Sequence, residues 1–119
     1  MPPVRHEPKT WIKSITALFI LKTLRQTSAY GNQIADHIKQ RTFGGLRPNP
    51  NFLYPLLRDM EEDGLVAGTR ENPAKRGRRV YTITARGLAY LEELNEPVRD
   101  KFLAIERKQA AIRQYLFEE

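Results

Sequence analysis

Apolar residues recur along most of this chain at the three- to four-residue spacing of amphipathic helices, and this spacing predicts five helices. The expected helices cover residues 10–25 (or 14–25), 32–41, 50–63, 85–94 and 97–117. Between the third and fourth helices, residues 65–71 and 79–84 are rich in residue types that favour strands, and they flank a loop of proline, glycine and cations. The pattern therefore predicts a mainly α chain with one small β-hairpin.

The third predicted helix has clear start and stop signals. Asn49 can cap it with its side-chain oxygen, with Pro50 at the first helical position, where a missing N–H costs nothing. A start at Asn51 is the alternative, because it would place Pro55 nearer the first turn. Gly64 should end the helix, since glycine takes the left-handed conformation that follows many helices.

The two faces of this helix differ in chemistry. One face carries an apolar stripe that we expect in the core: Leu53, Leu56, Leu57 and Met60. The opposite face carries polar or flat groups and one cation, which suit hydrogen bonding to a partner better than burial: Asn51, Tyr54, Pro55 and Arg58. The acidic run at residues 61–63 opposes the helix dipole, so we expect it to face solvent.

The last predicted helix carries a narrow apolar stripe with an alternating spacing of four and three residues. The stripe consists of Val98, Phe102, Ile105, Gln109, Ile112 and Leu116. About twenty residues make a rod of ~30 Å, which is too long for so small a domain to cover, so we expect a homodimer through this helix. Gln109 would set the register by a hydrogen bond across the seam. A helix that folds back onto its own domain is the alternative.

Charge is unevenly distributed along the chain, which has a formal net charge of +6 and a pI near 9.8. Residues 1–50 carry +6, residues 51–68 carry −3, residues 69–90 carry +5 and residues 91–119 carry −2. The cations of the hairpin region, with Glu71 as its one acid, are Arg70, Lys75, Arg76, Arg78, Arg79 and Arg86. This density favours a polyanionic partner, nucleic acid ahead of an anionic membrane surface, with phosphates bound at the hairpin tip.

Several classes of protein are disfavoured by composition. The chain has no cysteine, and His6 and His37 lack neighbours at metal-ligand spacing, so we expect neither a disulfide framework, nor a metal, nor a cofactor, nor an enzyme. No apolar run approaches the ~20 residues that span a bilayer, and the first residues lack a signal-peptide core, so we expect a cytoplasmic protein without a membrane partner. Residues 1–9 hold three prolines and no periodicity, which predicts a flexible arm.

Three runs of residues together resemble the winged helix-turn-helix of the PadR transcriptional regulators. They are the Leu-Tyr-Pro-Leu-Leu run at 53–57, the Glu-Asp-Gly-Leu-Val run at 62–66 and the spacing of Thr84 and Gly87, within a match from Ile15 to Leu91. The resemblance implies a winged helix-turn-helix DNA-binding domain over residues 10–94 and a C-terminal dimerisation helix over residues 95–119. It also implies a dimeric, sequence-specific transcriptional regulator that binds double-stranded DNA, most often as a repressor.

On this resemblance, the helix at 50–63 would read the major groove, and the hairpin, or wing, would follow the phosphate backbone. The residues expected at DNA are Asn49, Asn51, Phe52, Tyr54 and Arg58 on the helix, and Lys75, Arg76, Arg78 and Arg79 on the wing. Two positions depart from the family pattern, namely Asn32 in place of an aromatic and Phe52 in place of a small hydroxyl residue. Because Phe52 falls on the DNA-reading face or its edge, the target sequence does not carry over.

The resemblance further implies a small aromatic or apolar effector between the terminal helix and the domain. Trp11, Phe102 and Tyr115 are the candidate pocket, although core packing is the alternative role for Trp11. Two other functions remain compatible with the sequence. One is an architectural or RNA-binding winged-helix protein with little sequence preference. The other is a protein-interaction adaptor, which would leave the basic hairpin unexplained.

Overall fold

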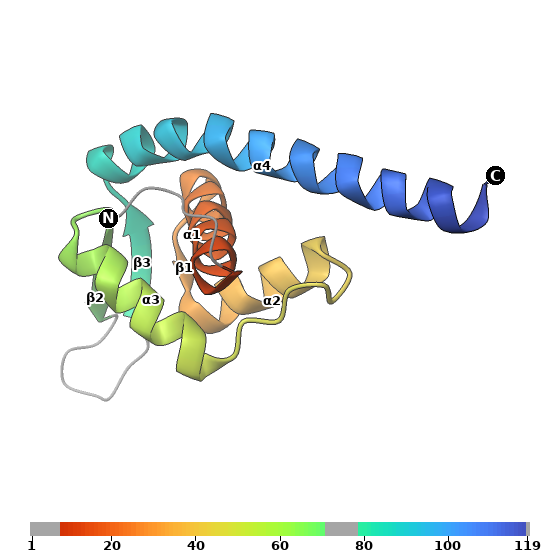
Figure 1. Cartoon of the computed structure of the whole chain (residues 1–119). Helices are drawn as coiled ribbons and strands as arrows, with labels where there is room; N and C mark the ends of the chain where they lie inside the picture. The colour runs from red at the N-terminus through yellow and green to blue at the C-terminus, as the bar shows by residue number, and fades with distance from the viewer. Residues whose placement is uncertain (1–7, 71–78, 119) are drawn as a thin grey trace.

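The computed structural model describes residues 8–70 and 79–118. In chain order its elements are α1 (Pro8–Gln26), β1 (Ala29–Tyr30), α2 (Gly31–Arg41), α3 (Pro50–Glu62), β2 (Val66–Arg70), β3 (Arg79–Ile83) and α4 (Ala85–Phe117). Figure 1 shows α1, α2 and α3 packed beside the strands, while α4 crosses above them and projects past the body. The predicted fold class, mainly α with a small β wing, is therefore confirmed.

One apolar core lies among the helices and the sheet. The stripe of α3 is buried as predicted, because none of its four apolar side chains is more than 2% exposed. It meets buried residues of α1 and α2, including Ile20, Leu21, Ile34 and Ile38. Leu91, Leu94 and Val98 of α4 close the core from the other side. This core holds α3 by its inner face and leaves its polar face outside.

Both ends of α3 follow the signals in the sequence. Asn49 is the N-cap, since its side-chain oxygen accepts a hydrogen bond from the Phe52 N–H at 3.0 Å, and this settles the choice of start. At the other end Gly64 has φ +77°. The Leu65 N–H then donates to the Met60 carbonyl at 2.9 Å, which closes the last turn and points the chain into β2.

The three strands form an antiparallel sheet in the order β1-β3-β2. The predicted hairpin is confirmed, with Val66 opposite Ile83 and Arg70 opposite Arg79. Ala29 and Tyr30, which precede the second helix and were not expected to form a strand, form β1 and pair with β3. The hairpin loop, with Lys75, Arg76 and Arg78, lies outside the described residues.

Two predicted boundaries are wrong. The first helix begins at Pro8, so Pro8 and Lys9 belong to α1 and not to an arm. Proline suits the first position of a helix, where its missing N–H is not needed. Residues 1–7 lie outside the described residues. The expected break at residues 95–97 is absent, because α4 runs for 33 residues with Pro97 inside it. Pro97 removes one N–H donor on the exposed side, while Leu94 and Val98 are buried against the body on either side of it and hold the helix together.

Candidate nucleic-acid interface

The outward face of α3 carries three of the predicted DNA-binding residues. Asn51, Tyr54 and Arg58 are exposed, and their spacing of three and four residues places them on one side of the helix. Asn49 is also exposed, but its side-chain oxygen caps the helix, so its amide NH₂ is the group that remains for a partner. Phe52 is half-buried and packs against the core, so it does not share the face of Asn51 and Tyr54.

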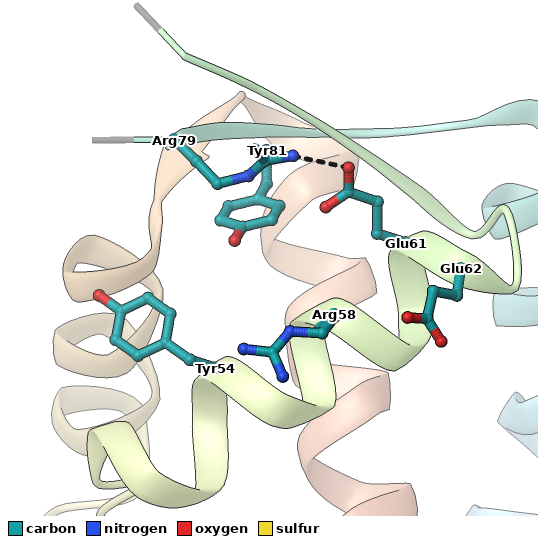
Figure 2. A pocket seen from close by; sticks show the side chains of 6 residues that line it. All are labelled: Tyr54, Arg58, Glu61, Glu62, Arg79 and Tyr81. Atoms are coloured by element: carbon teal, nitrogen blue, oxygen red, sulfur yellow. Dashed lines mark hydrogen bonds and ion pairs between the residues drawn. The ribbon is translucent and has the colours of Figure 1, made fainter. Parts of the chain in front are cut away.

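Tyr54 lies against the start of α2. A Cβ atom on Gly31 would stand 2.7 Å from Cε1 of the Tyr54 ring and 3.0 Å from its hydroxyl oxygen. The missing side chain at Gly31 therefore allows the two helices to approach at this point. The Tyr54 ring therefore packs over Gly31 at the edge of the α3 face (Figure 2).

A cavity of about 720 Å³ lies between α3 and the wing, and Figure 2 shows it. Its walls combine two tyrosines, two arginines and two glutamates: Tyr54, Arg58, Glu61, Glu62, Arg79 and Tyr81. The residues from α3 form one side, and Arg79 and Tyr81 of β3 form the other (Figure 2). The cavity thus joins the predicted reading helix to the root of the wing.

One ion pair crosses this cavity. The Arg79 guanidinium donates to Glu61 Oε2 at 2.7 Å and to the Gly68 carbonyl oxygen at 2.9 Å. Glu61 is therefore not a purely solvent-facing acid, as the sequence suggested for residues 61–63, because a cation from the wing reaches it. Arg79 in turn is directed back toward α3, and these two bonds engage one nitrogen of a guanidinium that was expected at DNA phosphates.

Tyr81 supplies a hydrogen-bond donor to the inner wall of the cavity. Burial raises the pKa of its hydroxyl above the usual value, while the nearby Arg79 charge acts in the opposite direction. A tyrosine hydroxyl is protonated at neutral pH, so that of Tyr81 can donate a hydrogen bond to an anion. Arg58 takes part in no ion pair among residues 8–70 and 79–118, so it brings a free positive charge to the same wall.

The predicted dimerisation stripe on α4 divides into two parts. Val98 is buried within its own domain, Phe102 is partly covered and Ile105 is half-buried. Farther along, Gln109, Ile112 and Leu116 are exposed, with Ile112 and Leu116 each 57% exposed. Val98 and Phe102 therefore contact this chain's own body, Ile105 lies at the boundary, and the part of α4 beyond it projects into solvent (Figure 1).

The candidate effector residues are only partly brought together. The rings of Trp11 and Phe102 lie 5.3 Å apart at an interplanar angle of 59°, which joins α1 to α4. Tyr115 is 82% exposed. It follows Phe102 by a further ~20 Å along the helix axis, so within one chain it does not reach the pair.

Sequence reasoning did not single out Gly31, Gly68 or Tyr81, or assign Glu61 a partner. The signal for Gly31 and Gly68 was weak, because a glycine that permits a close approach looks like any other glycine. Tyr81 follows the period-two alternation of a strand and was counted as strand-forming only.

Among the described helices, none combines the length and apolarity needed to cross a membrane.

Comparison with known proteins gives one consistent result. The sequence profile of the transcriptional regulator PadR-like family matches residues 20–93. The chain is 30% identical over 81 residues to transcriptional regulator YqjI of Escherichia coli, a match that covers 68% of this chain and 38% of that protein. It is 31% identical to transcriptional regulator Rv3488 of Mycobacterium tuberculosis, again over 68% of this chain and over 73% of that protein.

A solved structure of a transcriptional regulator from Thermoplasma acidophilum has the same fold. It superposes with a TM-score of 0.73 at 24% sequence identity, and the match covers 83% of this chain and 94% of the other. This chain spans well under half the length of YqjI, so the match to that relative concerns one part of it.

Proposed function

This chain belongs to the transcriptional regulator PadR-like family, and on that basis we propose that it is a DNA-binding transcriptional regulator that acts as a homodimer. The observation that carries the proposal is the outward face of α3, where exposed Asn51, Tyr54 and Arg58 stand next to a hairpin with a strongly basic loop. A helix held by a buried stripe and presenting polar groups outward is the usual reading element of a winged helix-turn-helix.

In the proposed complex α3 enters the major groove. Asn51 and Arg58 are the residues for base contacts, because an amide pairs with adenine and a guanidinium with guanine through two hydrogen bonds each. The amide NH₂ of Asn49 and the hydroxyl of Tyr54 are uncharged donors at the edge of that face, which suits the phosphates that flank the groove. The cations of the wing loop, Lys75, Arg76 and Arg78, would follow the backbone beside it.

The exposed part of α4 supports the proposed homodimer. Apolar side chains at Ile112 and Leu116 stand beside Gln109 on a helix end that its own domain does not cover. A second copy of the same helix would bury them and would place two α3 helices on two half-sites of one operator. Occupying an operator in this way suits a repressor, which is the role that we propose.

The division of labour between α3 and the wing can be tested by mutation. Changing Asn51 to Ala should cost ~1–3 kcal/mol on the preferred duplex, because one base contact is lost, and should leave nonspecific binding nearly unchanged. Changing Arg76 and Arg78 together to Ala should instead weaken all duplexes alike and make the log-affinity versus log-salt slope shallower by ~0.9 per lost phosphate contact. Fluorescence anisotropy on matched specific and scrambled duplexes, at several salt concentrations, measures both.

The two variants serve as controls for each other. If the wing variant lost discrimination while Asn51→Ala lost only general affinity, the roles of α3 and the wing would be reversed. If the unchanged protein bound a selected duplex no more tightly than bulk nucleic acid, the architectural or RNA-binding alternative would replace a sequence-specific regulator, which should show a preference of ~10³ or more.

The contact between Trp11 and Phe102 supports a proposed site for a small aromatic or apolar effector at the α1–α4 junction. Trp11 is the single tryptophan of the chain, so its fluorescence reports on this junction alone. A panel of planar aromatic compounds should include one that quenches Trp11 and shifts DNA affinity, and Phe102→Ala should abolish both responses. Quenching by no compound, or quenching that Phe102→Ala leaves intact, would contradict this site.

A further inference from the structure

Arg79 lies where the wing meets the helical body. It is the first residue of β3, directly after the loop that carries the wing cations. One nitrogen of its guanidinium donates both to Glu61 of α3, at 2.7 Å, and to the Gly68 carbonyl of β2, at 2.9 Å. We name this arrangement the Arg79 bridge, because it joins the two strands of the wing to the end of the predicted reading helix (Figure 2).

The missing side chain at Gly68 leaves room for this bridge. A Cβ atom on Gly68 would stand 3.0 Å from two guanidinium nitrogens of Arg79 and 3.0 Å from Glu61 Oε1. Such distances are tighter than ordinary van der Waals contact, so a side chain here would push the ion pair aside. The glycine, the arginine and the glutamate therefore form one matched arrangement across three elements.

The charges in the cavity separate the roles of the two arginines. Arg79 is paired with Glu61, and their side chains are 39% and 32% exposed, so a DNA phosphate would have to compete with a carboxylate already in place. Arg58 lines the same cavity without an ion pair among the described residues. The free charge offered to DNA at this point is therefore that of Arg58.

We propose that Arg79 is a positioning residue, which fixes the wing against α3 through Glu61 and Gly68 and does not itself bind a DNA phosphate. The bridge restrains β2 and β3 relative to α3, so less conformational freedom of these strands is lost when the wing meets DNA. Its effect on DNA affinity rests on the proposed function. The bridge itself can be measured without DNA.

The decisive comparison is Glu61→Gln against Glu62→Gln. Both variants remove one negative charge from the same turn of α3, but only Glu61 contacts Arg79. In Glu61→Gln the amides of Thr69 and Val80, which face each other across β2 and β3, should exchange with solvent about two- to fivefold faster than in Glu62→Gln, and the affinity for duplex should be lower by a similar factor. If Arg79 bound phosphate, losing Glu61 would free its guanidinium and raise affinity above that of Glu62→Gln.

A second variant keeps the net charge constant. The double substitution Glu61→Gln with Arg79→Gln should lose no more affinity than Glu61→Gln alone, and it should keep the wild-type salt slope, because no phosphate contact is removed. A slope shallower by ~0.9 would mean a lost phosphate contact and would overturn the proposal. Gly68→Ala, which disturbs the bridge while keeping both charges, should reproduce the faster exchange of Glu61→Gln.

The two kinds of measurement keep the proposals apart. Absence of duplex binding by the unchanged protein would refute the proposed function, and hydrogen exchange would still decide whether the bridge holds the wing. Equal exchange in Glu61→Gln and Glu62→Gln would refute the bridge, whether or not the protein binds DNA.

Discussion

Replacing both Ile105 and Ile112 with Asp is expected to convert the protein to monomers and to lower its affinity for a two-half-site operator by about a hundredfold or more. The affinity falls because two linked reading helices bind a double site with an avidity that a single domain lacks, typically ~10²–10⁴. The two carboxylates would stand in the α4 seam, where a second copy would have to desolvate them without a partner. Light scattering would report the mass, and anisotropy titration the affinity.

This substitution should spare the fold of the single domain. Ile112 is 57% exposed and Ile105 is half-buried, so neither belongs to the buried core. A matched control places two Asp residues on the opposite side of the same helix, at Ala110 and Gln114, which are both exposed. The control should remain dimeric. A dimer of unchanged stability in the Ile105/Ile112 variant would show that the stripe is not the seam.

The part of the fold that the sequence predicted best depends on local signals. The stripe of α3, the cap at Asn49 and the stop at Gly64 each depend on residues within a few positions of one another. The spacing of Thr84 and Gly87 likewise corresponds to a local cap on α4, since the Thr84 side-chain oxygen accepts from the Gly87 N–H at 3.0 Å. Helix propensity and the spacing of apolar residues are local properties of the sequence, so they predict these features without knowledge of the tertiary contacts.

The features that were missed depend on partners far apart in the chain. Strand β1 has only two residues, too few to show a periodic pattern, and it forms because it pairs with the edge of β3. The helix continues through Pro97 because packing on both sides of the proline outweighs one lost hydrogen bond. Glu61 and Arg79 are 18 positions apart, so their pairing appears only once the hairpin is folded against α3.

Substituting Gly87 by Ala is expected to destabilise the protein by about 2–4 kcal/mol, although alanine inside a helix is normally favoured over glycine by roughly 0.5–1 kcal/mol. A Cβ atom at this position would lie 2.1 Å from the Leu65 carbonyl oxygen and 2.8 Å from Ile83 Cγ1. The first turn of α4 therefore rests directly on the backbone where the chain leaves α3 for β2.

The Leu65 carbonyl cannot easily move away, because Thr84 holds it. The Thr84 N–H donates to this oxygen at 3.2 Å, and the Thr84 hydroxyl lies 3.0 Å from it and 2.6 Å from the Gly64 carbonyl oxygen. The added methyl group must therefore displace the start of α4 or break these bonds. Either change would disturb the junction from which both the wing and α4 extend.

Urea unfolding of the Gly87→Ala variant, followed by circular dichroism, measures the cost. Gly31→Ala is the matched control, because its Cβ would also meet an atom at 2.7 Å, but that atom belongs to the ring of Tyr54, which can rotate away. The control should lose clearly less stability, because a side chain adapts where a hydrogen-bonded backbone does not. If Gly87→Ala were as stable as the unchanged protein, or more stable, the contact between α4 and Leu65 would be able to relax. The junction would then not fix the wing relative to the helical body.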